Sequence, residues 1–473
     1  MIQVIIPMAV LLFIVLCRKI PVIGGKINVA LVAAGILTLL LGGLFTPSSW
    51  IAAWIDGLNR MAWIMALSIV GALFAEISMR IGTIDTIVGA LTAKFGHRPR
   101  ILIVCILFAL TLAGSLLGDA IAASTVIGIL TIGILVSMDL PFEKISAIIV
   151  MGASVGSIMP PMTQALALAS TLVGTDSDAV INIGYVTVPI VFLIVAFYCS
   201  FFLVKKENVP GKNTAVEIKY TDRKASEILK SNWKSLIPLF FLIIVVILRT
   251  VDIPYLSIDL GPTILQNINI LTIGEESLSL YDWLSNVTIL SGLTNGIVLS
   301  IICAIVVAFL CFKSLRQDIG GVFTQSFSKV KTTIILQVCC SFMLGSFYAA
   351  GSIDKVSEFA QNLDGNVLKI GGAACMLLLG MLTGSQSTTQ NVVFAFFGPA
   401  LVAFGVNPTF AAVAGAHLAA AGQGMPPADL TTFVVCGMVS AQFGKKVDPV
   451  KSMIYSLPMC ICFLIVGMIF LYI

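Results

Sequence analysis

The chain contains little charge. Only 11% of its 473 residues are Asp, Glu, Lys or Arg, whereas 58% are hydrophobic. A soluble globular protein of this length would expose more charge than this composition supplies. Many apolar runs reach roughly 20 residues, which is the length of a helix that crosses a bilayer. The sequence therefore predicts an all-α polytopic membrane protein embedded in lipid.

Several features on which other functions depend are scarce or absent. Two histidines, His97 and His417, are too few for a zinc cluster. The 11 cysteines are scattered through apolar runs, which favours packing over disulfides or metal binding. The sequence has no Gly-x-x-x-x-Gly-Lys-Ser/Thr loop, so an ATP-driven pump is disfavoured. The net charge of +4 is spread over short loops, which indicates membrane topology and not a nucleic-acid partner.

Lys and Arg residues mark the cytoplasmic ends of the spans. They predict about ten transmembrane helices with both termini outside. The first apolar run has no charged segment before it, so we expect a retained span and not a cleaved signal. We expect outer loops at 46–60 and at the acidic segment 250–285. After the first run, the predicted spans are 27–45, 61–80, 143–174, 183–204, 235–249, 287–312, 332–350, 408–440 and 451–473.

Two further apolar segments, 101–140 and 366–407, are interrupted by polar tips. The first tip begins Gly114-Ser-Leu-Leu-Gly-Asp119, and the second spans Thr383 to Asn391. If 101–140 crossed once, the charges at 143 and 144 would lie outside, and two crossings would each be short. We therefore expect re-entrant hairpins, whose backbone is tolerated at membrane depth when it is buried in protein or lines a cavity.

Each predicted hairpin is followed by a helix that contains a proline pair. The two stretches read GSIMPP at 156–161 and GQGMPP at 422–427, so the breaks lie at Pro160, Pro161, Pro426 and Pro427. Corresponding positions are 266 residues apart, beginning with Gly114 and Gly380. One such motif could be a kinked helix, but two copies behind similar hairpins indicate a duplication.

The duplication predicts two inverted repeats. The first broken helix runs from inside to outside and the second returns, as in many secondary transporters. We assign 1–204 to the first repeat, with hairpin 1 near 101–140 and broken helix 143–174. A cytoplasmic linker at 205–234 should end in an amphipathic helix. The second repeat is 235–473, with hairpin 2 near 366–407 and broken helix 408–440.

The breaks give these helices exposed backbone groups at mid-membrane. Proline removes a donor and clashes with the carbonyl four residues back, and glycine permits a turn and close approach of a ligand. Unpaired carbonyls at one half-helix end suit Na⁺, and unpaired amides at the next start suit a carboxylate. We therefore expect both hairpin tips and both breaks to form one central binding site.

These motifs resemble the ion transporter superfamily, and most of all the large membrane subunit (DctM-like) of the TRAP transporters. That family has a tip rich in Gly, Ser, Asp and Ala, which residues 114–125 resemble, followed by a Gly-x-x-x-Pro-Pro break. The resemblance implies Na⁺-coupled uptake of an organic carboxylate, C4-dicarboxylate-like, by an elevator motion against a scaffold. It also implies a bacterial inner-membrane location, a small membrane subunit, a periplasmic binding protein and a possible homodimer.

The candidate site residues come from the tips and the breaks. The predicted cation-binding residues are Gly118, Asp119, Gly152, Gly156, Gly384, Ser385, Gly422 and Gln423. The predicted substrate-binding residues are Ser115, Ser124, Thr125, Thr163, Gln164, Ser387, Thr388, Thr389 and Asn391. Any single Ser or Thr could instead bond its own helix backbone, so the clustering at the tips carries the prediction.

Ionisable residues at membrane depth are costly and are usually functional. Asp119, His417 and Asp429 are therefore candidates for proton coupling, although each has an alternative role. Asp119 and Asp429 could cap helices, and His417 could be a packing residue with a hydrogen bond. Glu76 and Arg80 are four residues apart and should form a structural pair on one helix.

Three other functions compete with a Na⁺-coupled symporter. A proton-coupled carboxylate transporter or a cation/proton antiporter of the same superfamily would use the same fold. An intramembrane protease with Asp119 and Asp429 as its dyad would not require duplicated proline breaks. A channel would not require two hairpins. We therefore expect a transporter and not an enzyme.

Overall fold

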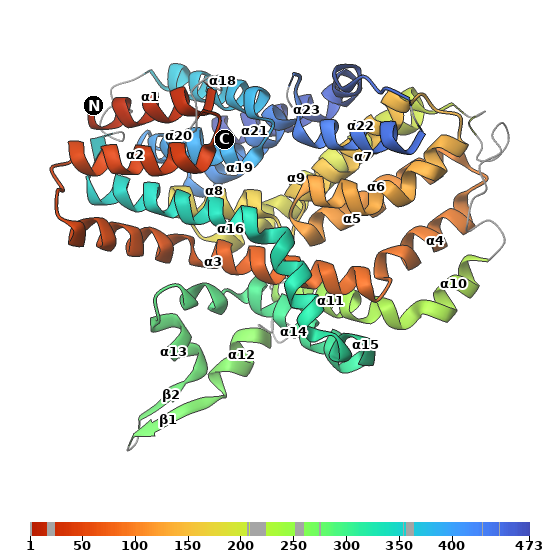
Figure 1. Ribbon diagram of the computed structural model, residues 1–473, viewed down its shortest axis with the longest axis horizontal. Coiled ribbons are helices and arrows are strands. Elements are labelled where there is room, and N and C mark those ends of the chain that lie inside the picture. Colours follow the sequence, from red (N-terminus) through yellow and green to blue (C-terminus); the bar gives the residue numbers. More distant parts are fainter. Residues whose placement is uncertain are drawn as a thin grey trace.

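The computed structural model is almost entirely helical (Figure 1). It describes residues 2–16, 24–205, 208, 224–250, 260–273, 276–352, 354–355, 364–427, 429–443 and 445–473. The predicted basic loop at Arg18 and Lys19, most of the linker 205–234 and parts of the acidic segment 250–285 lie outside these residues.

The first half of the chain forms nine α-helices and a short π-helix. They are α1 (Ile2–Leu16), α2 (Ile27–Leu41), α3 (Pro47–Arg80), α4 (Thr83–Phe95), α5 (Pro99–Leu117), α6 (Ala120–Ser137), α7 (Phe142–Ile158), α8 (Gln164–Val173), α9 (Ser177–Tyr198) and η1 (Cys199–Leu203). Hairpin 1 consists of α5 and α6, and the first broken helix consists of α7 and α8.

The middle of the chain contains shorter helices and one small sheet. They are α10 (Ala225–Asn232), η2 (Trp233–Leu236), α11 (Ile237–Thr250), α12 (Leu260–Gln266), β1 (Asn269–Ile273), β2 (Glu276–Ser279), α13 (Leu280–Asn286), η3 (Leu290–Thr294), α14 (Gly296–Cys311) and α15 (Lys313–Gln317). The predicted amphipathic helix of the linker is α10, which buries Ile228 and exposes Lys230.

The last part of the chain repeats the architecture of the first. It contains α16 (Ile319–Ala349), α18 (Gly365–Thr383), α19 (Gln386–Thr389), η4 (Gln390–Phe394), α20 (Ala395–Ala403), α21 (Pro408–Gly424), α22 (Leu430–Phe443) and α23 (Pro449–Tyr472). Hairpin 2 consists of α18 and the helical run α19–η4–α20. The second broken helix consists of α21 and α22.

The repeat is visible in the element boundaries. Helices α5 and α18 begin and end 266 residues apart, and so do α7 and α21. Both breaks fall at the predicted prolines, since α7 ends at Ile158 and α21 at Gly424. The last 14 residues of each of these helices are buried, because small and apolar side chains surround them on every side. The two helices that enter the breaks therefore form the centre of the protein.

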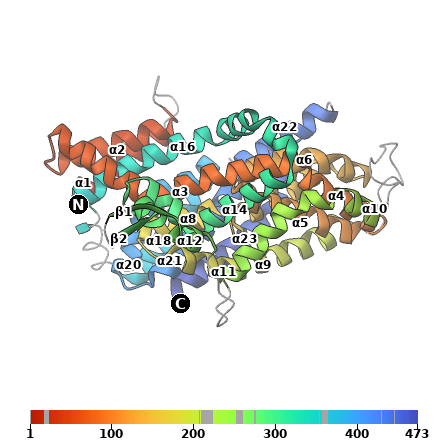
Figure 2. The same ribbon diagram turned by 90° about the horizontal axis from the view of Figure 1, so that it is seen from below.

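The helices divide into two packed sets. The helical core comprises α5–α9 and α18–α23, in which α7, α21 and α23 contact one another. The scaffold comprises α1–α4 and α10–α16, and its longest contact is between α3 and α16. Figures 1 and 2 show α3 and α16 running beside each other along the length of the molecule.

Small residues allow α3 and α16 to cross at backbone contact. A Cβ added to Gly57 would lie 1.8 Å from the Ser341 carbonyl oxygen, and one added to Gly345 would lie 1.8 Å from the Ala53 carbonyl oxygen. The two small-xxx-small pairs, Ala53/Gly57 and Ser341/Gly345, are the pattern by which membrane helices approach closely. Side chains other than glycine at either position would separate the scaffold helices.

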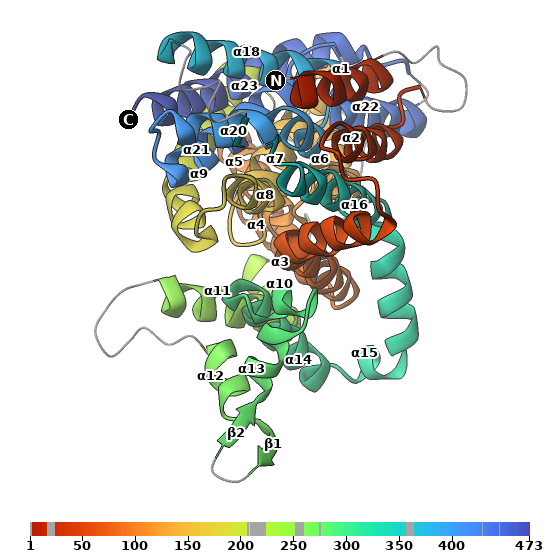
Figure 3. The same ribbon diagram turned by 90° about the vertical axis from the view of Figure 1, so that its left-hand side faces the viewer.

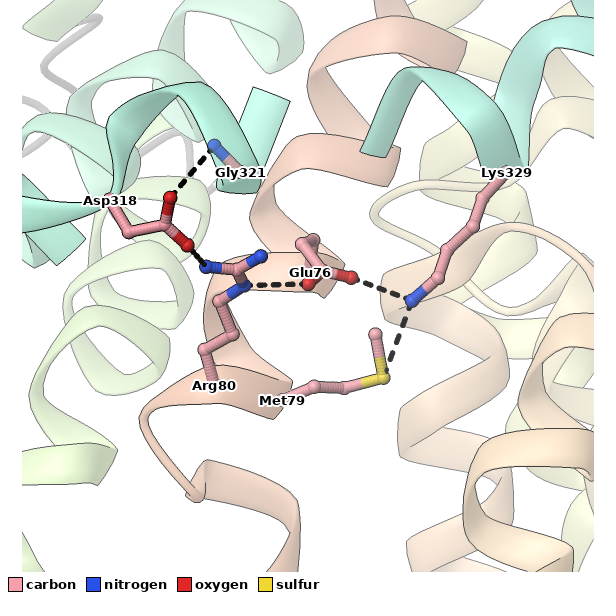
Figure 4. A network of polar contacts seen from close by, with 6 residues as sticks. All are labelled: Glu76, Met79, Arg80, Asp318, Gly321 and Lys329. Carbon is pink, nitrogen blue, oxygen red and sulfur yellow. Dashed lines mark hydrogen bonds and ion pairs between the residues drawn. The ribbon is translucent and has the colours of Figure 1, made fainter. Parts of the chain in front are cut away.

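A network of ion pairs joins the same two helices near one end of α3 (Figure 4). The predicted pair is present, with Arg80 Nε 2.8 Å from Glu76 Oε1. Glu76 also accepts from Lys329 Nζ at 2.6 Å, and Arg80 Nη1 reaches Asp318 Oδ2 at 2.7 Å. Because Glu76 is only 3% exposed and faces two cations from one buried position, it fixes α16 against α3.

Two predicted outer loops are wrong in detail. Residues 47–60 form the first half of α3, begun by the Thr46 cap and by Pro47 at the first helical position. The described part of 250–285 contains α12, α13 and the antiparallel pair β1–β2, in which Ile273 is opposite Glu276. Figure 3 shows this pair at the far end of the scaffold from α18 and α23. Turn and strand residues there carry no membrane signal, so charge alone suggested a loop.

Other boundaries also differ from the sequence prediction. Helix α16 begins at Ile319 and not near 332, and α4 was not predicted. Among the described residues, six helical stretches are long and apolar enough to cross a bilayer, and others are shorter. The predicted count of ten spans and the orientation of the termini stay predictions.

Candidate functional site

The two hairpin tips have the same local structure. Gly118 has φ +63° and donates its N–H to the Gly114 carbonyl oxygen at 2.8 Å. Gly384 has φ +63° and donates to the Gly380 carbonyl oxygen at 2.7 Å. Glycine adopts this left-handed conformation without a Cβ penalty, and it ends each first arm so that the chain can turn back.

The two breaks also match. After α7, the Met159 N–H donates to the Gly156 carbonyl oxygen at 2.9 Å, and after α21 Met425 donates to Gly422 at 3.3 Å. The Pro160–Pro161 and Pro426–Pro427 peptide bonds are both cis. Since neither α7 nor α21 continues as a rod, both helices end inside the protein, as predicted.

Each hairpin packs against its broken helix through glycines. A Cβ added to Gly114 would lie 2.6 Å from Gly156 Cα, and one added to Gly380 would lie 2.7 Å from Gly422 Cα. Gly152 also packs here, and its carbonyl oxygen accepts from the Thr111 hydroxyl at 3.1 Å. The predicted cation-binding residues Gly152, Gly156 and Gly422 therefore lie at helix contacts, where they set how closely tip and break approach.

A side chain caps the helix that follows each interruption. Asp119 accepts from the Ala122 N–H at 2.7 Å, and Ser385, at the corresponding position of the second repeat, accepts from Thr388 N–H at 3.3 Å. At the breaks, Thr163 accepts from the Leu166 N–H at 3.3 Å, and Asp429 accepts from Thr431 and Thr432. Each repeat thus has one carboxylate and one hydroxyl cap, in opposite places.

These four interruptions meet around a cavity of about 100 Å³. The starts of α6, α8, α22 and the run α19–η4–α20 all contribute to its wall, as do the tips and the end of each first half-helix. The scaffold supplies Ile64, Leu336 and Gln337. The core residues that line it are Gly118, Asp119, Ala120, Ile121, Ser157, Gln164, Ala165, Leu168, Gly384, Ser385, Gln386, Ser387, Gln390, Asn391, Gln423, Leu430 and Thr431.

Hydrogen bonds across this cavity connect hairpin 2 to both breaks. The Gln386 backbone N–H donates to Gln423 Oε1 at 3.2 Å, and its side-chain Nε2 donates to Ser157 Oγ at 3.3 Å. Gln390 Nε2 donates to the Ala165 carbonyl oxygen at 3.0 Å. Tip and breaks therefore lie at one depth, which is the arrangement that a re-entrant hairpin requires.

A second cavity of about 480 Å³ adjoins the first. The two share Asp119, Ile121 and Gln164, and the second extends to Thr125 and to Lys329 of the scaffold. Lys329 belongs to the ion-pair network around Glu76. Asp119 therefore stands at the junction between the central cavity and a wider vestibule that ends at the scaffold cations.

The predicted substrate-binding residues separate into two groups. The cavity wall includes Gln164, Ser387 and Asn391, and the vestibule wall includes Thr125. The remaining hydroxyl groups bond nearby backbone or caps, which is the alternative that the sequence left open. Their partners are Pro160 O for Ser115, Ile121 O for Ser124, Leu166 N for Thr163, Ser385 Oγ for Thr388 and Ser385 O for Thr389.

The three ionisable candidates have different surroundings. His417 is fully buried, its Nδ1 lies 2.8 Å from the Val413 carbonyl oxygen, and its ring packs on Phe463, so it is a packing residue. Both oxygens of Asp429 accept hydrogen bonds within its own cap. Asp119 has one capping bond and lines both cavities. Of the three, Asp119 is the group placed to meet an ion.

Five polar residues of the cavity were missed by the sequence analysis. They are Ser157, Gln337, Gln386, Gln390 and Thr431. Ser157, Gln386 and Thr431 are next to predicted residues, so extending each motif by a few positions would have found them. Gln337 lies in an apolar run on another helix, where the sequence has no signal for it.

The comparisons with solved structures identify the same fold. The YdaH transporter of Alcanivorax borkumensis has a TM-score of 0.60 and 13% identity, over 87% of this chain and 85% of that chain. MtrF of Neisseria gonorrhoeae, described within a class of antimetabolite efflux pumps, has a TM-score of 0.57 and 14% identity, over 93% and 84%.

The comparisons of sequence identify the family. No curated protein has a significant sequence match. The family model for the DctM component of the tripartite ATP-independent periplasmic transporters matches residues 10–473, nearly the whole chain. The constant spacing of the two hairpins and two broken helices accords with that match. The chain belongs to the DctM family of TRAP transporter membrane components.

Proposed function

We propose that this protein imports an organic carboxylate, C4-dicarboxylate-like, in symport with Na⁺. Membership of the family makes it a secondary transporter of the membrane. The observation that carries the proposal is the central cavity, where four helix starts and the ends of four other helices converge. Helix starts attract anions and helix ends attract cations, so one small cavity can bind both.

The caps suggest where each charge binds. Thr163 and Ser385 are neutral, so the starts of α8 and of the run from Gln386 keep their attraction for a carboxylate. Asp119 places a negative charge at the start of α6 and beside the end of α5. We assign Na⁺ to the tip of hairpin 1, near Gly118 and Asp119, and the substrate carboxylate to the side of Gln164 and Ser385.

An elevator motion would carry this cavity across the membrane. The helical core supplies most of the wall, and the scaffold supplies Ile64, Leu336 and Gln337. The scaffold is fixed internally by the glycine crossing of α3 and α16 and by the Glu76 network. We therefore propose that the core moves as a body against a rigid scaffold.

The family also suggests partners and a location. Its transporters are tripartite, so we expect a small membrane subunit and a periplasmic binding protein to work with this chain in the bacterial inner membrane. We further propose a homodimer through the scaffold, with both termini outside.

Thermal unfolding of the purified chain tests the ion. Raising Na⁺ at constant ionic strength, with choline as the replacement, should raise the unfolding temperature. At 100 times its dissociation constant an ion adds about 2.7 kcal/mol of stability. Asp119→Asn should abolish this response, whereas Asp56→Asn, whose pair with Arg60 is exposed, should keep it. A full Na⁺ response in Asp119→Asn would contradict the assignment.

Uptake into proteoliposomes that contain the chain with its partner subunits tests the coupling. We expect accumulation of organic acids under an inward Na⁺ gradient, and it should persist when the pH gradient is collapsed. Uptake driven by a pH gradient alone would instead support a proton-coupled transporter, with Asp119 as the proton carrier. Movement of Na⁺ against protons without any organic acid would support an antiporter.

A further inference from the structure

Two glutamine side chains of the central cavity have a buried carbonyl oxygen without a hydrogen-bond partner in the protein. They are Gln337 of α16 and Gln390 of η4. Gln337 is 6% exposed and Gln390 is 0% exposed. A buried acceptor without a partner is unfavourable, and native proteins contain few of them. Two in one cavity therefore indicate a ligand that supplies the missing donors.

The orientation of the Gln337 amide follows from its neighbour. Ser68 donates its single hydroxyl hydrogen to the Ile64 carbonyl oxygen at 2.9 Å. At 2.8 Å from Gln337, Ser68 Oγ can then only accept, so the group that faces it must be the amide nitrogen. The Gln337 carbonyl oxygen consequently points away from Ser68 and cannot be exchanged with the nitrogen.

The orientation of the Gln390 amide is fixed in the same way. Its nitrogen lies 3.0 Å from the Ala165 carbonyl oxygen, which can only accept a hydrogen bond. The Gln390 carbonyl oxygen is therefore the free end. Ala165 is at the start of α8, so this bond also ties hairpin 2 to the first break and holds the amide in place.

The charge of the cavity wall agrees with these acceptors. Among the lining residues that the structure describes, Asp119 is the single charged side chain. A ligand with carboxylates alone would bring only acceptors to a wall that already offers two free carbonyl oxygens and one carboxylate. A ligand with hydroxyl or amino groups would satisfy them.

We propose that the transported organic acid also carries hydrogen-bond donors, as a hydroxy acid or an amino acid does, and that Gln337 and Gln390 select it by those donors. This rests on the proposed function and narrows its substrate class, away from unsubstituted dicarboxylates. Gln337 belongs to the scaffold and Gln390 to the helical core, so the ligand bridges the two bodies. Gln337 is then a scaffold-borne specificity residue.

Matched ligand pairs test the substrate class. The purified chain in Na⁺ is heated with adipate or galactarate, which are six-carbon diacids without and with four hydroxyl groups, and with succinate or aspartate. We expect at least one substituted member to raise the unfolding temperature and its unsubstituted partner to have no effect. Equal or larger shifts with adipate or succinate would overturn the proposal, and so would the absence of any shift across a wider panel of hydroxy and amino acids.

Variants test the two glutamines. Gln337→Leu and Gln390→Leu each remove an unpaired buried acceptor, so the ligand-free protein should be as stable as wild type or more stable. Each should weaken the donor-bearing ligand by roughly tenfold, as expected for one net hydrogen bond. Gln317→Leu, on the exposed α15, is the matched control. Gln337→Met retains side-chain length and replaces Gln337→Leu if that variant folds poorly.

The Na⁺ titration separates this inference from the proposed coupling. If Gln337→Leu or Gln390→Leu shifts the Na⁺ midpoint and leaves ligand affinity unchanged, the free oxygens are cation ligands and the inference is wrong. If a donor-bearing acid binds through both glutamines without any Na⁺ dependence, the inference stands and Na⁺ coupling fails.

Discussion

Gly380→Ala tests the contact that holds hairpin 2 against the broken helix α21. The new Cβ would lie 2.6 Å from the Gly422 carbonyl carbon, 2.7 Å from its Cα and 2.9 Å from the Gln423 nitrogen. Ordinary contacts begin near 3.4 Å, so α18 and α21 must separate by about 0.8 Å. All three atoms belong to backbone, and therefore no side chain can rotate away to make room.

Two opposing effects set the size of the change. Ala is more favourable than Gly inside a helix by about 1 kcal/mol. Overpacking a dense interior costs roughly 1–3 kcal/mol, and a clash between two backbones belongs at the upper end. We expect a net loss of about 1–2 kcal/mol, together with a displaced Gln386–Gln423 hydrogen bond and slower transport.

The control lies in the same helix. Gly371 also belongs to α18, but a Cβ there meets no atom within 4 Å, so Gly371→Ala should gain the helix propensity alone. Thermal unfolding in detergent compares the two variants at equal Na⁺. Gly114→Ala should resemble Gly380→Ala because its Cβ meets Gly156 at the same distances. If Gly380→Ala is as stable as Gly371→Ala, the close approach of hairpin and broken helix does not exist.

Two further predictions concern the scaffold. Gly345→Ala should lower the unfolding temperature strongly because its Cβ would lie 1.8 Å from a carbonyl oxygen of α3, whereas Gly320→Ala in the same helix meets nothing; equal stabilities would exclude the crossing. Glu76→Gln leaves two cations without their buried anion and should cost about 1–3 kcal/mol. The exposed pair of Asp56 makes Asp56→Asn the control, with a loss below about 1 kcal/mol, and a similar small loss in Glu76→Gln would contradict the structural role of the network.

The sequence predicted the core of the fold because its signals are local and repeated. Proline pairs at 160–161 and 426–427 have one main consequence inside an apolar helix, and the constant spacing supplied the matching hairpins. The turn positions were equally accessible, since glycines at 118 and 384 come directly before capping residues. These features required no knowledge of contacts between distant segments.

The remaining features depend on such contacts. Thr111 bonds the Gly152 carbonyl oxygen, which removed that glycine from the candidate site. Gln337 enters the cavity only because α16 crosses α3, and a lone glutamine in an apolar run predicts no partner. Residues 47–60 continue α3 because they lie along α16, although their tryptophans and charges suggested an outer loop.

The placement of the capping carboxylates makes the two halves of the chain unequal. Asp119 caps a tip in the first half and Asp429 caps a break in the second, while hydroxyl groups occupy the matching positions. A symmetric protein assembled from two copies of the first half would place both acids at the tips, and two copies of the second would place both at the breaks. Neither hybrid reproduces the present charge pattern, so the copies diverged after they were joined, and each now depends on the other for a complete binding centre.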